Sequence, residues 1–304
     1  MHAKRMLMRV CTTLALLALI PSPVSLDSTL QAQKPAPACS LCTVWNVPQA
    51  PFRIYGNTYY VGPHGLASIL IVSDAGLVLI DGALPQSAPQ IAANIHSLGF
   101  RIEDVKLILN SHAHFDHAGG IAELQRLSGA EVVVSPWSAE VMKKGGVDKG
   151  DPRYGDILGI PPVAGVRTLH AGESLHLGQV VLTPHATPGH TPGGTSWTWQ
   201  SCDAGRCLDM VYADSISAVS AEGYKFSQNP HAMQEFEQSF AFLDHVPCGI
   251  LLTPHGESSG FWDHIDQRNR GVKPDPLIDS SACRKLADAG REQLKKRIAT
   301  ETAH

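Results

Sequence analysis

The sequence predicts an α/β fold in which two halves pack sheet on sheet with helices outside. Three observations support this prediction. Short apolar runs rich in β-branched residues alternate with segments of helical periodicity, many of these runs end in turn residues, and the coarse strand–helix order occurs twice along the chain. Helices and sheets must each bury an apolar face, so such an order favours layers that share a core.

Composition is that of an ordinary globular protein. The chain has 304 residues, of which 43% are hydrophobic and 17% are charged. This length is sufficient for a sizeable core in one large domain or two small ones. The formal net charge of −4 provides no basic footprint for nucleic acid, so we expect no nucleic-acid partner. Histidine is abundant, with 15 residues.

The first segment is typical of a secretory signal. Three basic residues precede an apolar run from Val10 to Ile20, which is too short to span a bilayer as a stable helix. We expect cleavage near Ala32 and a periplasmic protein with no membrane attachment afterwards. A short N-terminal membrane anchor is the alternative. The expected organisation is a signal peptide at 1–32, a Pro/Ala-rich extension at 33–50 and the main domain at 51–304.

For the first half of that domain, the sequence predicts a series of strands with two helices between them. The expected strands are FRIYG, TYYVG, ASILIVSD, GLVLIDG, DVKLILNS and EVVVS. Helical spacing of apolar residues predicts helices over 88–98 and 121–127. Residues 145–165 are rich in Gly and Pro and have little periodicity, which predicts a long surface loop of the kind that is often functional.

The second half repeats the pattern. Its expected strands are VRTLH, QVVLTPHATPGH, GTSWTWQ, DMVYADS and GILLTPHG. A helical stripe covers 231–245, and Asp279 or Ser280 could cap a last helix that runs to about Thr300. Alternation of Trp197 and Trp199 with polar residues predicts that both pack in the core.

Export would permit disulfides among the six cysteines that follow Cys11 of the signal, with 15 possible pairings. Cys202 and Cys207 bracket a turn-like insert, so we expect a local bridge across a hairpin. Cys248 and Cys283 would then tie the last strand to the C-terminal helix.

Cys39 and Cys42 form a CxxC pair in the extension. Zinc binding would need a second pair nearby, and redox chemistry would need a βαβ context. A structural disulfide is therefore the favoured interpretation.

Ligand-type side chains gather where strands end. They are His112, His114, Asp116 and His117 in "SHAHFDH", His190 in "TPGHTPGG" and His255 in "LLTPHG". Function collects on such loops because strands fix them while their tips stay accessible. A catalytic zinc keeps three protein ligands and one open position, so two such sites require six ligands, and the loops supply six. Separate core or surface histidines are the alternative, which the density of this pattern disfavours.

Two nearby residues are not expected to be ligands. His185 lies within "TPHATPGH" and is interpreted as a loop histidine. Cys207 lies at a suitable distance after His190, but it precedes a strand rather than ending one. Arg153 could meet an anionic substrate, although a solvated loop arginine is the simpler interpretation.

Taken together, these motifs resemble the metallo-β-lactamase superfamily. The resemblance runs from about Tyr55 to Cys283 and implies an αββα sandwich with a dinuclear metal site. Finer features, "YGNTYYVG", "HAHFDHAGG", "PGHTPGGTSWTW", "VYADSIS" and "LLTPH", resemble subclass B3 β-lactamases. By this resemblance the first of two Zn²⁺ ions takes His112, His114 and His190. The second takes Asp116, His117 and His255.

The resemblance also implies the activity. A metal-bound hydroxide would hydrolyse the amide bond of penicillins, cephalosporins or carbapenems, and Asp116 would help to orient it. Ser215 and Ser217 would contact the carboxylate of this small-molecule substrate. Asp214 would stay outside the metal ligands, although an Asp214 that bridges both metals is the competing interpretation. We expect a monomer.

In some members of the family an N-terminal cysteine pairs with one in the turn after the second strand. Here that turn carries His64 instead, which supports a Cys39–Cys42 bridge.

Other functions remain open at this point. A lactonase or thioesterase of the same fold, similar to glyoxalase II, would be favoured by an Asp214 bridge. A zinc-storing protein would be favoured by a saturated metal shell. A diiron oxidoreductase would be expected to carry a flavin module, and no segment of the sequence resembles one.

Overall fold

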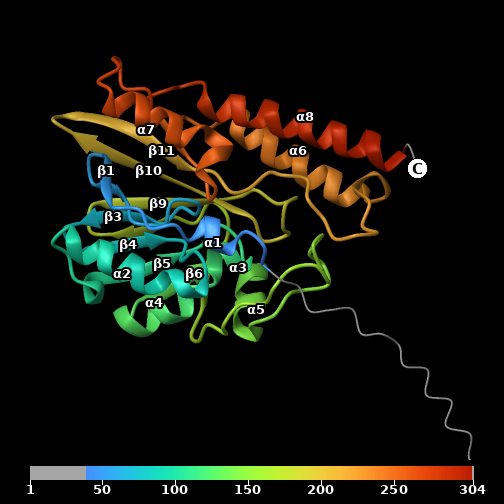
Figure 1. Cartoon of the computed structure of the whole chain (residues 1–304), viewed down its shortest axis with the longest axis horizontal. Helices are drawn as coiled ribbons and strands as arrows, with labels where there is room; N and C mark the ends of the chain where they lie inside the picture. The colour runs from blue at the N-terminus through green and yellow to red at the C-terminus, as the bar shows by residue number, and fades with distance from the viewer. Residues whose placement is uncertain (1–38, 303–304) are drawn as a thin grey trace, which may run out of the picture. The chain divides into compact units, whose positions relative to one another are not determined.

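The computed structural model describes residues 39–302, and the expected signal peptide with its Cys11 lies outside them. The strands of the described part form two sheets (Figure 1). No helix within residues 39–302 is long and apolar enough to cross a membrane.

The first sheet has seven strands in sequential order. They are β1 (Phe52–Tyr55), β2 (Thr58–Tyr60), β3 (Ile69–Ser73), β4 (Gly76–Ile80), β5 (Val105–Leu109), β6 (Glu131–Val134) and β7 (Arg167–Thr168). Strands β1 to β4 pair antiparallel, whereas β4 to β7 pair parallel. The parallel part brings the carboxyl ends of β4, β5 and β6 to one edge.

The second sheet has five strands in the order β12-β11-β10-β9-β8. Their bounds are β8 (Leu175–Leu177), β9 (Val180–Ala186), β10 (Thr195–Asp203), β11 (Arg206–Tyr212) and β12 (Ile250–Leu252). Strands β8 to β11 pair antiparallel, and β11 pairs parallel with β12. The carboxyl ends of β11 and β12 therefore lie side by side.

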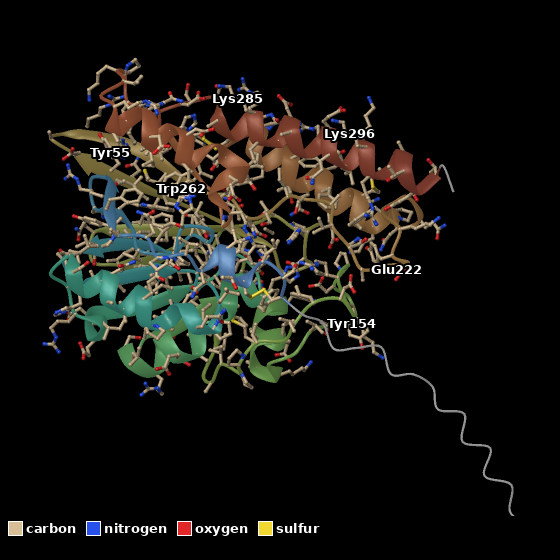
Figure 2. The ribbon with its side chains drawn as sticks, viewed as in Figure 1. Tyr55, Tyr154, Glu222, Trp262, Lys285 and Lys296 are labelled. Carbon is tan, nitrogen blue, oxygen red and sulfur yellow. A yellow bond between two sulfur atoms is a disulfide. The ribbon has the colours of Figure 1, made fainter. Side chains whose placement is uncertain are left out.

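Helices cover the outer face of each sheet (Figure 1). Beside the first sheet lie α2 (Ala88–Ser97), α4 (Ile121–Ser128) and α5 (Pro136–Lys144). Beside the second lie α6 (Pro230–His245), α7 (Phe261–Asn269) and α8 (Ala282–Thr302). Two short helices flank strands of the first sheet. Helix α1 (Cys42–Trp45) precedes β1, and helix α3 (Phe115–Ala118) follows β5. Lys285 and Lys296 project outward from α8 (Figure 2).

Strand alternation explains why the layers stack in this way. In β3, Ile69 and Ile71 pack between the two sheets, while Leu70 packs against the helices of the first half. Successive strand side chains point to opposite faces, so an apolar residue at every position fills two interfaces. A third apolar cluster lies between the second sheet and helices α6 and α8, around Phe236 and Phe240. The predicted two-sheet α/β fold is thus confirmed.

Both tryptophans of β10 lie in the core between the sheets, as the sequence predicts. Trp197 and Trp199 are 0% and 4% exposed. The indole of Trp197 donates to the Asn110 carbonyl at 3.0 Å, and that of Trp199 donates to Thr58 Oγ1 at 3.1 Å. Each buried indole N–H therefore has a partner in the opposite sheet.

The three expected disulfides are present. Cys202 and Cys207 face each other across the β10–β11 hairpin and are bonded. Cys248, just before β12, is bonded to Cys283 in the first turn of α8. The CxxC pair forms a bridge of its own, Cys39–Cys42, at the start of α1.

Some elements differ from the sequence-based prediction. Helices α5 and α7 and strand β8 were not predicted, and β7 covers only two residues of the expected VRTLH strand. A start signal for α5 is present in the sequence: the Ser135 side chain accepts from the Ser138 amide, and Pro136 occupies the first helical position. The stretch between α5 and β7 contains no regular element, in agreement with the expected loop at 145–165.

Candidate metal centre

The strand ends bring the six predicted ligands together from different parts of the sequence. His112 and His114 follow β5, and Asp116 and His117 belong to the short α3 that comes next. The other two come from the second sheet: His190 lies between β9 and β10, and His255 follows β12. The site therefore lies where the two sheets meet, at the carboxyl ends of their parallel strands.

One group of three histidines has metal-ligand geometry. His112, His114 and His190 each offer a nitrogen, and these atoms lie within 4.8 Å of one another. Their rings are nearly perpendicular, with centroids 4.6 to 5.0 Å apart. Three imidazoles that converge in this manner match a three-ligand catalytic zinc site. We call these residues the first group.

A second group lies next to it and shares His112. Ligand atoms of His112, Asp116 and His117 also lie within 4.8 Å of one another. His255 completes this side, because its Nε2 is 3.3 Å from Asp116 Oδ2 and its ring centroid is 4.8 Å from that of His117. All six predicted ligands therefore belong to one contiguous cluster.

The donor atoms of this cluster fit a cation. His112 Nε2 and Asp116 Oδ1 are buried and have no hydrogen-bond partner. Buried polar atoms are rarely left unpaired, and both atoms carry lone pairs that a metal ion accepts. Within residues 39–302, the ion-pair contacts of Asp116, Asp151 and Asp214 are all with histidines, so positive charge from lysine or arginine in this part of the chain does not balance these carboxylates.

Burial also keeps three of the imidazoles neutral, as metal ligation requires. Burial, together with the neighbouring His112 and His114, lowers the pKa of His190 to about 3. Burial is also the main cause that lowers the pKa of His112 and of His117. Burial alone would raise the pKa of Asp116, but the adjacent His117 and His255 hold it well below its ordinary value. His112, His117 and His190 thus offer neutral imidazoles near neutral pH, and Asp116 offers an ionised carboxylate.

Each histidine of the first group is held by a hydrogen bond to its other nitrogen. His112 Nδ1 donates to Asp214 Oδ1 at 2.7 Å, and His190 Nδ1 donates to the Ser217 carbonyl at 2.9 Å. His114 Nε2 donates to Asp151 Oδ2 at 2.8 Å. Such partners fix the tautomer and the ring orientation of metal-binding histidines.

Asp214 belongs to neither of the two metal-ligand groups. Its Oδ1 is engaged by His112 Nδ1, on the side of the ring opposite to the unpaired Nε2, whereas its Oδ2 is buried and has no hydrogen-bond partner. Gly194, the second glycine of "TPGG", lies directly against this carboxylate: a Cβ there would be 2.5 Å from Asp214 Oδ2. Only a residue without a side chain permits this approach.

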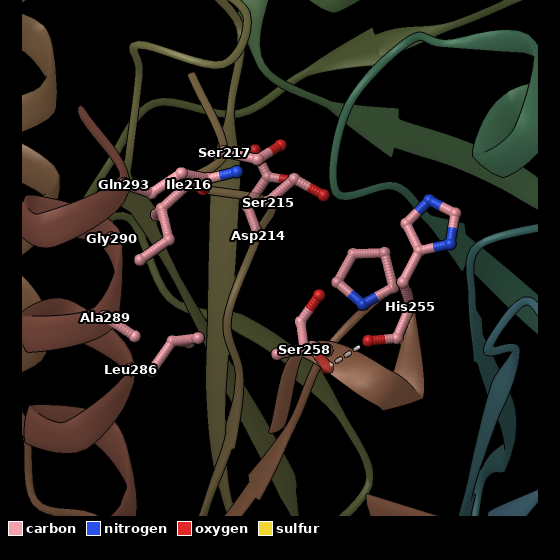
Figure 3. Close-up of a pocket in the computed structure, with 12 residues that line it drawn as sticks. Asp214, Ser215, Ile216, Ser217, His255, Ser258, Leu286, Ala289, Gly290 and Gln293 are labelled. Atoms are coloured by element: carbon pink, nitrogen blue, oxygen red, sulfur yellow. Dashed lines mark hydrogen bonds between the residues drawn. The ribbon is translucent and has the colours of Figure 1, made fainter. Parts of the chain in front are cut away.

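Ser215 and Ser217 lie beside the cluster on the loop that follows β11. Together with His255, they line a cavity of about 310 Å³ that continues to Leu286, Gly290 and Gln293 of α8 (Figure 3). The lining combines polar side chains, among them Ser215, Ser217 and Gln293, with the apolar side chains of Ile216 and Leu286. Both predicted substrate contacts therefore adjoin the metal-ligand cluster.

The sequence analysis missed two residues that contact this centre. Asp151 lies in the Gly/Pro-rich loop, where no local pattern distinguishes it from Asp148 or Asp156. Trp45 lies in α1, and its ring centroid is 5.2 Å from that of His255. The only sequence signal for this contact was the presence of a tryptophan in the extension, and that tryptophan has no fixed spacing to the ligand motifs.

His185, which was not expected to be a ligand, lies apart from the cluster. It belongs to β9, stacks on Phe242 at 4.5 Å and contacts Thr198 Oγ1 through Nε2 at 2.9 Å. Its contacts are thus those of a packed strand residue. Arg153 is half-buried and lines a small pocket with residues of the extension, among them Trp45.

Comparison with known proteins agrees with this geometry. Residues 61–276 match the family model of the metallo-β-lactamase superfamily. The structure of the Rm3 metallo-β-lactamase is 52% identical, covers 88% of this chain and all of its own, and superposes with a TM-score of 0.84. MEM-A1, a subclass B3 metallo-β-lactamase from a soil metagenome library, is 45% identical, with 85% and 99% coverage and a TM-score of 0.83.

Curated sequences give a more distant match. A hydroxyacylglutathione hydrolase from Rhodospirillum rubrum is 27% identical over 42% of this chain. The aligned region spans 41% of that relative, less than half of its length. With most of its length matched by the family model and by the two lactamase structures, this chain belongs to the metallo-β-lactamase superfamily.

Proposed function

We propose that this protein is a zinc-dependent β-lactamase that hydrolyses the amide bond of β-lactam antibiotics. The observation that carries this proposal is the position of His255. It belongs to the metal-ligand cluster and also lines the cavity that contains Ser215 and Ser217. A substrate carboxylate at these serines would lie beside the metals. The likeness to Rm3 and MEM-A1 over nearly their whole length supports the same activity.

Two zinc ions are proposed, one for each side of the cluster. His112, His114 and His190 would hold the first, and Asp116, His117 and His255 would hold the second. When bound, zinc polarises the amide carbonyl and makes water nucleophilic at neutral pH by lowering its pKa.

Asp116 is the residue of this chain that would act on the attacking water. Its Oδ1 has no hydrogen-bond partner, while its Oδ2 faces His117 and His255. An ionised carboxylate can only accept hydrogen bonds, so Asp116 would orient the attacking water by accepting a hydrogen bond from it. Water adds to the carbonyl carbon, the C–N bond of the ring breaks, and the ring nitrogen takes up a proton.

Ser215 and Ser217 would bind the carboxylate of the substrate. Both side chains are half-buried at the wall of the cavity, and their hydroxyls can donate to an anion. No lysine or arginine lines this cavity in the described part of the chain, so neutral donors would carry the recognition. Trp45, whose ring lies against that of His255, would provide an apolar wall on the other side.

The test is loss of β-lactam absorbance by the purified mature chain, with a penicillin and a carbapenem. Each substrate is measured with zinc and again after chelation. Zinc-dependent turnover is expected. Zinc binding without turnover of either compound would contradict the proposal, and hydrolysis of a glutathione thioester or a lactone would then favour the second candidate.

That second candidate is a thioester or lactone hydrolase on the same fold. The match to hydroxyacylglutathione hydrolases favours it. The hydrogen bond of Asp214 to His112 disfavours it, because a bridging Asp214 would face the metals.

We also propose that the protein is exported and confers resistance to β-lactam antibiotics. Three disulfides support an oxidising compartment such as the periplasm. Signal cleavage near Ala32 can be checked by sequencing the N-terminus of the mature protein after cell fractionation. A monomer without membrane attachment is proposed for the mature form, and its mass in solution tests this.

A further inference from the structure

Asp151 is a buried carboxylate on an irregular loop that the sequence predicts to lie at the surface. It lies within residues 145–165, between α5 and β7, yet its side chain is only 2% exposed. Its Oδ2 accepts from His114 Nε2 at 2.8 Å, and that histidine is 3% exposed. Burial of a charged group is costly unless it is paired, so this pair requires an explanation.

We propose that Asp151 is a positioning residue that orients His114 for metal binding and thereby couples the 145–165 loop to the metal centre. The inference rests on the metal site of the proposed function. It goes beyond that function because it assigns a role to a residue and a loop outside the ligand set.

The hydrogen bond fixes which nitrogen of His114 is available to a metal. A carboxylate only accepts hydrogen bonds, so Nε2 must carry the proton that lies between the two side chains. Nδ1 then keeps the lone pair and is the ligand atom that His114 offers to the first group. A carboxylate partner also makes an imidazole more basic and so a better ligand.

Asp151 is itself held in place by the loop. Its Oδ1 accepts from the Arg153 amide at 2.8 Å, and its carbonyl accepts from the Tyr154 amide at 2.9 Å. Next to it, the Pro152 carbonyl accepts from the Ala221 amide at 2.9 Å. That contact ties the loop to the segment that carries Ser215 and Ser217.

The rest of the loop has its own anchors. Ile157, Ile160 and Val163 are at most 4% exposed and pack in the cluster that contains Met142 of α5. Tyr154 points outward and is 46% exposed (Figure 2). The loop is thus fixed by apolar contacts near its end and by Asp151 near the metal centre.

The hydrogen-bond partner of His114 comes from a different kind of segment than the partners of the other two histidines of the first group. Asp214, the partner of His112, lies two residues after β11, and His190 is held by the carbonyl and the hydroxyl of Ser217 on the same loop. His114 depends on a carboxylate from a long irregular segment. Coupling is reciprocal, so metal at His114 should order the loop as much as the loop favours metal.

The test compares Asp151→Ala, Asp151→Asn and a control, Asp148→Asn. Asp148 lies in the same loop, and its Oδ1 accepts from the Gly150 amide at 2.8 Å. Zinc affinity is measured by competition with a chelator, and the geometry of the first group is followed by the absorption spectrum of the cobalt-substituted protein.

We expect Asp151→Ala to weaken zinc binding by about 10- to 100-fold, the usual effect of losing such a partner. Asp151→Asn keeps an acceptor for His114 and should lose less. The cobalt spectrum should change in the Ala variant, whereas Asp148→Asn should match the unchanged protein in both measurements. Hydrogen exchange at the amides of 154–157 should slow on metal loading in the unchanged protein and not in Asp151→Ala.

The outcomes separate this inference from the proposed function. If the unchanged protein binds no zinc, the metal site itself is wrong. If it binds zinc and both Asp151 variants bind with the same affinity and spectrum, only the role of Asp151 is wrong. Should Asp151→Ala fail to fold, Asp151→Asn decides, because its shape is preserved and only the charge of the partner is lost.

Discussion

His112 Nδ1 donates to Asp214 Oδ1 across 2.7 Å, and both side chains are fully buried. His112 follows β5 of the seven-stranded sheet, whereas Asp214 follows β11 of the five-stranded sheet. The hydrogen bond therefore joins the two sheets at the metal centre. Because His112 belongs to both metal-ligand groups, its orientation affects both sides of the cluster.

Replacement of Asp214 by asparagine should weaken metal binding without changing the number of ions bound. An amide oxygen can still accept from His112 Nδ1, but it is a weaker acceptor than a carboxylate, and we expect about 10-fold weaker binding. Metal content by mass spectrometry and affinity by chelator competition measure the two quantities. Asp209→Asn, on β11 and in contact with Gln200, is the matched control. A fall in metal content from two ions to one would instead indicate that Asp214 bridges the metals.

Removal of the Ser217 hydroxyl should separate substrate binding from metal binding. The Ser217 backbone carbonyl holds His190 Nδ1 at 2.9 Å and is retained in Ser217→Ala. Only the longer contact of Ser217 Oγ with the same nitrogen, at 3.1 Å, is lost, so zinc affinity should stay within about twofold. Loss of a donor to a carboxylate should lower kcat/KM for a penicillin by about 10-fold, mainly through KM. Steady-state kinetics of Ser215→Ala, Ser217→Ala and the double variant test this. An unchanged KM in the double variant would show that the substrate carboxylate binds elsewhere.

The sequence predicts the parts of this fold that depend on local periodicity. Strand β4 is a continuous apolar run because both of its faces are buried, and helix α2 shows its apolar stripe at helical spacing. The HxHxDH motif could also be interpreted from the sequence, because its members are close together along the chain. Short helices such as α7 escape prediction because tertiary packing of Phe261 and Ile265, rather than a long stripe, holds them.

The contacts that orient the ligands could not be predicted in the same way. Asp151 is 37 residues from His114, and Asp214 is 102 residues from His112. No spacing rule connects such pairs, because each depends on how a loop folds back over a sheet edge. Trp45 is a similar case: only the tertiary structure shows its ring against His255.

Loss of the Cys248–Cys283 bridge should destabilise the protein more than loss of Cys39–Cys42. The first closes a loop of sequence separation 35 and the second one of separation 3. A cross-link limits the entropy of the unfolded chain more when its loop is longer, so we expect a loss of about 4 kcal/mol against about 2 kcal/mol or less. Urea unfolding of the two double alanine variants measures this difference. Equal losses would mean that the CxxC bridge stabilises α1 by folded-state contacts.

Asp279 should make stability depend on pH at the start of α8. Hydrogen bonds from Lys285 and Ser281 lower its pKa to about 2, below an ordinary value of about 3.9. A depressed folded pKa stabilises the protein above the unfolded pKa, and this contribution is lost as the pH falls through the folded pKa. About half should be gone at pH 3.

Asp279→Asn removes this ionisable carboxylate and isolates its contribution. The side chain is 30% exposed, so the difference in unfolding free energy at pH 7 should be only about 1 kcal/mol. Urea unfolding of the metal-free proteins between pH 7 and pH 3 should show the two stabilities converging as the pH falls below about 4. A difference that stays constant over this range would mean that Asp279 acts on α8 through its shape and hydrogen bonds, because a neutral amide would then be deficient to the same extent at every pH.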